Sequence, residues 1–168
     1  MQLLVIRHAI AEERDAFATS GQPDAERPLT DYGRRRMKRN AKGLLRVAKS
    51  PDAIATSPFA RAAETAHIVA DAFGVNRIEV LDALTPERAP RDLIPWLSTH
   101  AGDAVVAVVG HEPHLGMLVT WFLGGREESH LELKKGGACL LELAGDLEPG
   151  KALLQWLLTP SQLRSIGD

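Results

Sequence analysis

The sequence has very few of the features that would build a cross-linked, membrane-spanning or secreted protein. It has one cysteine, Cys139, so no disulfide can form within the chain. Its longest apolar run covers residues 104–109, far short of the roughly 20 residues that a membrane-spanning helix needs. The N-terminal segment MQLLVIRHA lacks the basic region and the long apolar stretch of a signal peptide. We therefore predict a cytoplasmic protein whose thiol stays reduced.

The chain also lacks a large excess of one charge. Its 20 Lys and Arg residues against 22 Asp and Glu residues give a net charge of −2, which excludes bulk electrostatic binding to nucleic acid as its default role. The charges are uneven, because residues 27–49 hold nine basic residues and one acid, Asp31, or 9 − 1 = +8. Three interpretations of this segment stay open. They are, in order, a solvated helix face, a docking surface for an acidic or phosphorylated protein, and a nucleic-acid surface with Tyr32 as its one aromatic residue.

The length and composition fit a single domain over residues 1–168, with 45% hydrophobic and 25% charged residues. Short apolar segments alternate with segments of helical periodicity through the first three-quarters of the chain. This alternation predicts an α/β fold with a mostly parallel central sheet and helices on both faces. Strands are expected at 3–6, 53–56, 78–81 and 104–109, and a C-terminal antiparallel hairpin is expected from 138–144 and 152–158.

Capping residues and breakers predict where the helices begin and end. Thr30 is suited to cap a helix that Ser50-Pro51 ends. Ser57 is the predicted N-cap of the next helix, with Pro58 in its first turn and Gly74 at its C-terminal end. Further helices are expected over 90–99 and 113–123, and the polar segment 12–28 is expected to be a loop.

The residues that follow the predicted strands indicate a binding site. Ligands of parallel α/β sheets bind beyond the carboxyl ends of the strands. Arg7 and His8 follow the first strand, Ser57 follows the second, and His111 follows the long apolar strand. Arg61 lies in the first turn of the helix after Ser57, where the helix N-terminus favours anions. We therefore expect these side chains to meet at one edge of the sheet.

Five sequence blocks make the chain recognisable when they are taken together. They are LLVIRHA at 3–9, RPLTDYG at 27–33, ATSPFARAAETA at 55–66, VVGHEPHLG at 108–116 and WLLTPSQL at 156–163. With these blocks in this order, nearly the whole chain resembles the histidine phosphatase superfamily, and within it the SixA-type phosphohistidine phosphatases. The R-H-G motif of the superfamily stands here as Arg7-His8-Ala9. The resemblance implies a phosphoglycerate mutase-like fold. The 49 residues between Arg61 and His111 (111 − 61 − 1) leave no room for a large cap insertion.

The resemblance also implies a role for each site residue. His8 is the implied nucleophile, which forms a phospho-His8 intermediate that water hydrolyses. Arg7, Arg61 and His111 are implied to bind the phosphoryl oxygens, and Ser57 can donate a hydrogen bond to them. His114 could orient His111, contact the phosphate or cap its helix. No cofactor is implied, and we see no cluster of carboxylates or cysteines in the sequence that matches a metal site.

The acid that protonates the leaving group in this superfamily is not evident in the sequence. Glu87, in the segment LDALTPER, is the nearest candidate, and Asp82 is a second. Glu12 and Glu13, in the loop after His8, stay open as well. Because imidazole is a much less basic leaving group than an alkoxide, a phosphohistidine phosphatase could work with a poorly placed acid.

The implied function is hydrolysis of phosphohistidine on a protein in signal transduction, for example on a histidine-containing phosphotransfer domain. Two alternatives stay open. The same site could hydrolyse a small-molecule phosphate ester, or the chain could be a phosphoprotein-binding module with little turnover. Neither nucleic acid nor a membrane is expected as a partner, and the oligomeric state is left open by the sequence.

Overall fold

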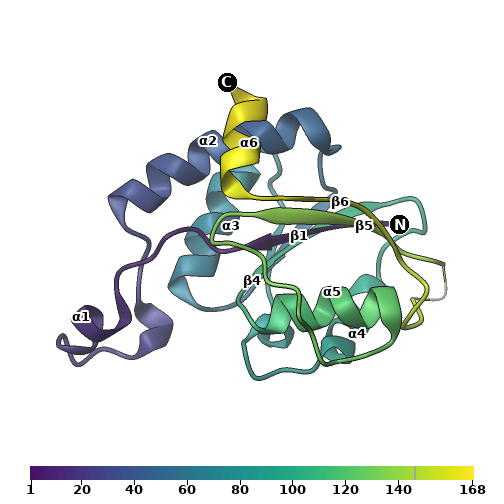
Figure 1. Ribbon diagram of the computed structural model, residues 1–168, viewed down its shortest axis with the longest axis horizontal. Coiled ribbons are helices and arrows are strands. Elements are labelled where there is room, and N and C mark those ends of the chain that lie inside the picture. The colour runs from purple at the N-terminus through teal and green to yellow at the C-terminus, as the bar shows by residue number, and fades with distance from the viewer. Residues whose placement is uncertain (146) are drawn as a thin grey trace.

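The computed structural model describes residues 1–145 and 147–168, which form one six-stranded sheet with helices around it (Figure 1). The strand order is β3-β2-β4-β1-β5-β6. The pairs among β1 to β4 are parallel, whereas β5 runs antiparallel to β1 and β6 runs antiparallel to β5. The predicted mostly parallel sheet with antiparallel C-terminal strands is confirmed. The strands are β1 (Gln2–Arg7), β2 (Ala53–Thr56), β3 (Ile78–Val80), β4 (Val105–Gly110), β5 (Ala138–Glu142) and β6 (Leu153–Leu158).

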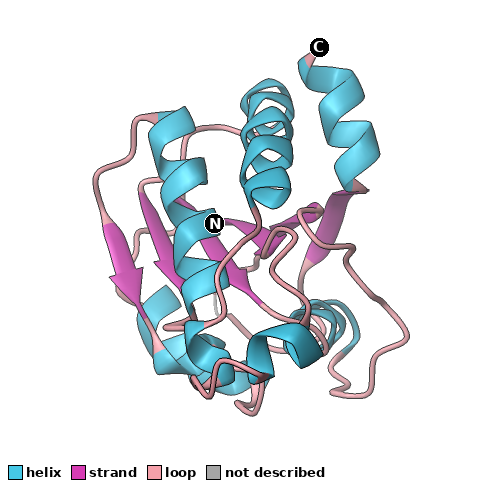
Figure 2. Ribbon diagram, turned by 90° about the vertical axis from the view of Figure 1, so that its left-hand side faces the viewer, coloured by secondary structure: helices cyan, strands magenta, loops and turns pink. Residues whose placement is uncertain are grey.

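Helices cover both faces of the sheet, as predicted (Figures 1 and 2). On one face lie α2 (Asp31–Val47), α3 (Ala60–Phe73) and α6 (Pro160–Gly167), and on the other lie α4 (Ile94–Leu97) and α5 (His114–Gly124). A hydrophobic core lies on each face of the sheet. The central strand β1 contributes side chains to both cores, because alternate side chains of a strand point to opposite faces. Leu4 and Ile6 pack toward α2 and α3, and Leu3 and Val5 pack toward α5.

Local signals in the sequence determine several helix ends. The Thr30 side chain accepts a hydrogen bond from the backbone N–H of Gly33 over 2.9 Å, as an N-cap does. Gly74 ends α3 in the left-handed conformation, with a φ of 71°, which a residue without Cβ adopts readily. The helix predicted over 90–99 is a 3₁₀ turn (Pro90–Leu93) followed by α4.

The predicted N-cap role of Ser57 is wrong. The helix α3 begins three residues later, at Ala60, and its N-cap position is held by Phe59, whose side chain makes no capping hydrogen bond. The reason is tertiary, because the Ser57 hydroxyl lies 2.8 Å from Nε2 of His111 instead. It also accepts a weaker hydrogen bond from the Phe59 backbone N–H over 3.3 Å.

The segment predicted to be a loop, residues 12–28, contains two short helices. These are α1 (Arg14–Ala18) and a 3₁₀ turn (Asp24–Glu26). Neither buries a residue, so neither has the apolar periodicity by which a helix is predicted from sequence. Figure 1 shows that α1 projects beyond the end of the sheet at which β1 ends.

The C-terminal helix α6 was not predicted from the sequence. A capping box begins it, in which the side chain of Thr159 and that of Gln162 each bond the other residue's backbone N–H. The helix packs closely on α2 because Gly43 has no side chain, and the carbonyl oxygen of Leu163 occupies the space that a Cβ at position 43 would need. In the described chain, no helix combines the length and the apolar character that crossing a membrane requires.

Candidate active site

The ends of β1 and β4 bring the two predicted site histidines together. These strands pair in parallel with Arg7 opposite Gly110, so the residues that follow them leave the sheet at the same edge. The backbone N–H of His8 donates to the carbonyl oxygen of Gly110 over 3.0 Å. The ring centroids of His8 and His111 lie 5.1 Å apart. The predicted meeting of these strand ends is confirmed.

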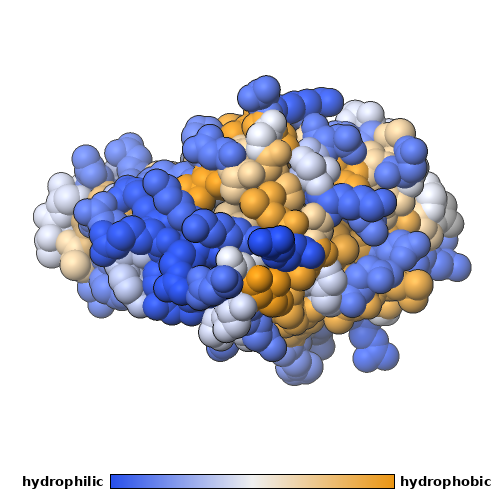
Figure 3. All heavy atoms as spheres, turned by 90° about the horizontal axis from the view of Figure 1, so that it is seen from above, coloured by the Kyte–Doolittle hydropathy of each residue, from blue (hydrophilic) through white to orange (hydrophobic). Residues whose placement is uncertain are grey.

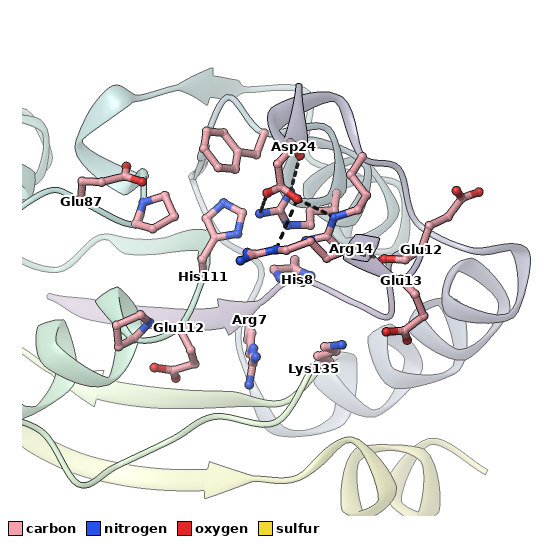
Figure 4. A pocket seen from close by; sticks show the side chains of 15 residues that line it. Arg7, His8, Glu12, Glu13, Arg14, Asp24, Glu87, His111, Glu112 and Lys135 are labelled. Carbon is pink, nitrogen blue, oxygen red and sulfur yellow. Dashed lines mark hydrogen bonds and ion pairs between the residues drawn. The ribbon is translucent and has the colours of Figure 1, made fainter. Parts of the chain in front are cut away.

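Both histidines line a cavity of about 490 Å³, which we call the His8 cavity (Figure 4). Of the predicted site residues, Arg7, Arg61 and Glu87 line it too. In Figure 4, Asp24 lies on one side of His8, and Arg7 and Lys135 lie on the other. The remaining lining residues are Glu12, Glu13, Arg14, Asp24, Arg27, Phe59, Pro86, Glu112, Pro113 and Lys135.

The His8 ring is neutral and held in one tautomer. Its Nδ1 lies 2.7 Å from the carbonyl oxygen of Ala9. A carbonyl oxygen can only accept, so Nδ1 carries the proton and Nε2 carries the lone pair. Burial and the charges of Arg61, Arg7 and Lys135 together lower the pKa of His8 from the ordinary 6.5 to about 3, although the Ala9 hydrogen bond opposes them. Nε2 therefore presents an unprotonated lone pair at neutral pH, as a nucleophilic imidazole requires.

A buried threonine fixes the backbone beside His8. The backbone N–H of Ala9 donates to Oγ1 of Thr65 over 3.0 Å, and Thr65 donates to the carbonyl oxygen of Arg61 over 2.7 Å. Thr65 is fully buried. The first turns of α3 thus hold both Arg61 and the backbone N–H of Ala9, the residue whose carbonyl oxygen bonds the His8 ring.

Arg61 is a buried cation held by one acidic residue. Its Nη1 donates to the carbonyl oxygen of Asp24 over 2.9 Å, and its Nη2 donates to the Asp24 carboxylate over 3.1 Å. The same carboxylate accepts from Nε of Arg27 over 2.8 Å and lies 3.6 Å from Nε of Arg14. Although partial burial raises the pKa of Asp24, the Arg27 hydrogen bond and the three arginine charges lower it overall. Asp24 therefore stays ionised and orients the arginines.

Arg7 is held on the opposite side of His8 by the segment that leads into β5. Its Nη1 donates to the carbonyl oxygen of Leu133 over 2.6 Å and to Glu132 over 3.1 Å. That segment is held in turn by Glu112, which accepts the backbone N–H of Leu133 over 2.8 Å and that of Gly116 over 3.1 Å. Burial raises the pKa of Glu112, against these two hydrogen bonds.

His111 is held by Ser57 and is also neutral. The pKa of His111 is lowered to about 2, mainly by burial and further by the electrostatic effect of the neighbouring His8 and Arg61. The Ser57 hydroxyl can donate to Nε2 of His111 or accept from it, besides accepting from the Phe59 N–H. In the tautomer in which Ser57 donates, the ring proton of His111 lies on Nδ1.

Three buried nitrogens of the site have no hydrogen-bond partner among the described residues. They are Nε of Arg7, Nε of Arg61 and Nδ1 of His111. Buried N–H groups are normally hydrogen-bonded, so a cluster without protein partners indicates a site for a ligand that accepts hydrogen bonds. Two guanidiniums and an imidazole N–H beside a free imidazole nitrogen can bind a tetrahedral oxyanion and attack it.

Several predicted residues do not enter this cluster. His114 is fully buried, is absent from the cavity lining, and has no hydrogen-bond partner in the described chain for either ring nitrogen. Asp82 is exposed and lies outside the lining. Glu12 and Glu87 are exposed at the rim, and Figure 4 shows their carboxylates on opposite sides, away from His8. Across the described ranges, no three His, Cys, Asp or Glu side chains converge to hold a metal ion.

Sequence reasoning missed Asp24, Arg14 and Lys135 as parts of the site. Asp24 and Arg27 are three residues apart, a spacing that pairs charges within one turn, and this was a signal that could have been used. Lys135 carried no signal, because it is brought to the cavity by the long connection between α5 and β5.

Comparison with known proteins finds relatives of this chain in sequence and in structure. Residues 3–89 match the family described as Histidine phosphatase superfamily (branch 1). The chain is 32% identical over 138 residues to the phosphohistidine phosphatase SixA homolog of Haemophilus influenzae, covering 75% of this chain and 79% of that protein. It is 28% identical over 167 residues to the phosphohistidine phosphatase SixA of Escherichia coli, covering 98% and 97%. A solved structure of the protein histidine phosphatase SixA complexed with tungstate is similar at a TM-score of 0.82, with 26% identity, covering 97% of this chain and 99% of that one.

Proposed function

Because this chain belongs to the histidine phosphatase superfamily and is SixA-like, we propose that it hydrolyses phosphohistidine on a protein, with His8 as the nucleophile. The observation that carries the proposal is the position of Nε2 of His8, a free lone pair beside three unpartnered buried nitrogens. The similar SixA structure holds tungstate, a tetrahedral oxyanion like phosphate, and this supports an oxyanion site here.

In the first step, Nε2 of His8 attacks phosphorus and forms a P–N bond. The P–N bond of the substrate breaks, and its electron pair returns to the imidazole nitrogen of the substrate. Arg7, Arg61 and His111 balance the charge on the phosphoryl oxygens. The His8 ring becomes cationic, and the hydrogen bond from its Nδ1 to Ala9 stabilises that charge.

In the second step, water attacks the phosphorus of phospho-His8. The P–N bond to Nε2 breaks, its electron pair returns to His8, and inorganic phosphate leaves.

The leaving group of the first step needs little help from an acid. A substrate imidazole that is protonated on its other nitrogen departs as a neutral molecule. Glu87 and Glu12 lie at the rim of the cavity, which is compatible with a first step that needs little proton donation from an acid.

The arrangement around the cavity supports a protein substrate. In the described chain, the stretch between Arg61 and His111 consists of α3, β3, β4 and short helical turns, with no separate cap domain. A phosphorylated side chain on the surface of another protein can therefore reach His8.

The test is hydrolysis of a phosphohistidine protein and of p-nitrophenyl phosphate, with EDTA present, by the wild type and His8→Ala. His67→Ala is a matched control, because His67 is an exposed residue of α3. We expect turnover by the wild type and the control, loss of at least about 10³-fold in His8→Ala, and an acid-labile phosphate on His8 after rapid quenching.

The same assay separates the alternatives. Turnover of the aryl phosphate with none of the phosphoprotein would favour a small phosphate ester as substrate. Binding of the phosphoprotein with no turnover and no phospho-His8 would favour a binding module and contradict the proposal.

A further inference from the structure

A shallow groove lies beside the His8 cavity and shares a residue with it. The groove, of about 50 Å³, lies between α2, α6 and Lys135, and we call it the basic groove. Arg36, Lys135 and Arg164 line it, and among the described residues no acidic side chain does. Lys135 also lines the His8 cavity, so the two sites are adjacent.

The three cations of the basic groove are not neutralised by carboxylates. Arg36 lies over the ring of Tyr32, 5.1 Å from its centroid, and Arg164 donates to the neutral amide oxygen of Asn40 over 3.0 Å. Within the described ranges, neither Arg36, Arg164 nor Lys135 forms an ion pair. Their positive charge is therefore available to a partner.

The neighbouring acids are already engaged elsewhere. Asp31 and Glu64 pair with Arg34, and Asp168 pairs with Arg39 over 2.6 Å. Burial and the charges of Arg36 and Arg39 lower the pKa of Arg164, although Asp168 opposes this. Like charges held together repel one another, so an anion bound here would relieve that repulsion.

The basic groove is linked to the end of β1 by a chain of hydrogen bonds through a buried asparagine. Asn40, which is only 2% exposed, accepts from Arg164 and donates from Nδ2 to the carbonyl oxygen of Gly136 over 2.9 Å. The N–H of Gly136 donates to the carbonyl oxygen of His8 over 3.0 Å. Gly136 has a φ of 79°, and a Cβ there would lie 2.7 Å from Nδ2 of Asn40. These hydrogen bonds set the position of the basic groove relative to His8.

We propose that the basic groove binds carboxylates that flank the phosphohistidine on the surface of the substrate protein. This inference rests on the proposed function, because it names the surface by which the same site selects its substrate. Figure 3, viewed onto the face of α2 and α6, shows strongly hydrophilic side chains gathered over the end of the molecule that carries the N-terminal part of α2. Nucleic acid fits less well, since among the described residues no aromatic side chain lines the groove to stack on a base, and Arg36 lies over one face of the neighbouring Tyr32 ring.

The experiment compares kcat/KM on a phosphohistidine phosphotransfer domain with kcat/KM on p-nitrophenyl phosphate. The variants are Arg36→Glu and Arg164→Glu, and the control is Arg46→Glu, an exposed arginine ten residues along α2 from Arg36 and about 15 Å away. We expect the ratio of the two kcat/KM values to fall about tenfold in Arg36→Glu, through KM for the phosphoprotein, and to stay at the wild-type value in Arg46→Glu.

Ionic strength gives a second readout that needs no substitution. Raising KCl from about 0.05 M to about 0.3 M should raise KM for the phosphoprotein several-fold in the wild type and in Arg46→Glu. The rise should be smaller in Arg36→Glu, and KM for the aryl phosphate should change less in all three proteins. This comparison also holds if Arg164→Glu fails to fold.

Equal ratios in Arg36→Glu and Arg46→Glu, with equal salt dependence, would overturn the inference and leave the proposed function standing. Binding of tRNA or of phosphatidylserine vesicles that depends on Arg36, without any effect on the phosphoprotein reaction, would overturn it in favour of another partner. A wild type that hydrolyses the aryl phosphate but never the phosphoprotein would overturn the proposed function, and this inference with it.

Discussion

The Nδ1 atom of His8 donates to the carbonyl oxygen of the next residue, Ala9, over 2.7 Å, which leaves Nε2 unprotonated in the cavity. A contact between neighbours in the chain would be weakly determined if the backbone of Ala9 could move freely. Thr65 restrains that backbone from the preceding peptide, because it accepts the N–H of Ala9. The position of the His8 ring is therefore supported by a residue of α3 that does not enter the cavity lining.

The two neutral histidines predict a loss of stability in acid. The pKa values of His8 and His111 are about 3 and about 2 in the folded protein, against about 6.5 in the unfolded chain. Below pH 6.5 the unfolded chain binds protons that the folded protein does not, so the free energy of unfolding falls as the pH is lowered. Each histidine contributes a slope of up to about 1.4 kcal/mol per pH unit over this interval.

Urea denaturation between pH 7.5 and pH 4.5 measures this effect. The variants His8→Asn and His111→Asn should each show a shallower slope than the wild type. His67→Asn, at an exposed position, should keep the wild-type slope. Parallel slopes in all four proteins would show that the two active-site rings are protonated in the folded state.

Replacement of Thr65 with valine should weaken both stability and catalysis. The valine keeps the size but leaves the buried N–H of Ala9 without its acceptor, which costs about 1–3 kcal/mol. Because Thr65 restrains the backbone of Ala9, whose carbonyl oxygen bonds the His8 ring, kcat should fall on every substrate. Thr65→Ser keeps the hydroxyl and should recover most of both losses. A Thr65→Val enzyme with full kcat would contradict the positioning role.

Replacement of Asp24 with asparagine should strengthen phosphate binding while destabilising the free protein. Arg61 loses its carboxylate but keeps the contact to the carbonyl oxygen of residue 24, and the unfolding free energy should fall by about 1–2 kcal/mol. Removing a negative charge beside the oxyanion site should lower the Kd for inorganic phosphate several-fold. Thermal denaturation with and without phosphate measures both effects.

The matched control for Asp24 is Asp31→Asn, since Asp31 also pairs with an arginine but lies at the surface. An exposed pair contributes little, so this variant should behave like the wild type toward phosphate. Weaker phosphate binding in Asp24→Asn would mean that the orientation of the arginines outweighs the removed charge.

Replacement of Glu87 with glutamine should separate substrates by their leaving groups. An alkoxide needs a proton when it departs, whereas a protonated imidazole does not, so hydrolysis of phosphoserine should fall more than hydrolysis of phosphohistidine. Steady-state kcat/KM on the two compounds gives the comparison. Equal losses on both substrates would contradict the idea that a phosphohistidine phosphatase needs little help from this acid.

Part of the site could be predicted because it depends on order along the chain. Four apolar segments alternating with helical segments predict a parallel sheet, and a parallel sheet places the residues after its strands at one edge. Arg7, His8 and His111 were found in this way, and Arg61 was found from its place in the first turn of a helix. The same reasoning misassigned Ser57 as an N-cap, since local pattern cannot show that a histidine 54 residues away binds the hydroxyl.

The sequence by itself determined the strands, most of the helices, the four strand-end and helix-end residues of the site, and the family to which the chain belongs. These features follow from periodicity and from motifs of fixed spacing. The tertiary structure alone decided which nitrogen of His8 is free, that Asp24 clamps Arg61, and that Lys135 joins the His8 cavity to the basic groove. Each of these depends on loops whose paths are set by packing against distant elements, and such contacts leave no periodic signal in the chain.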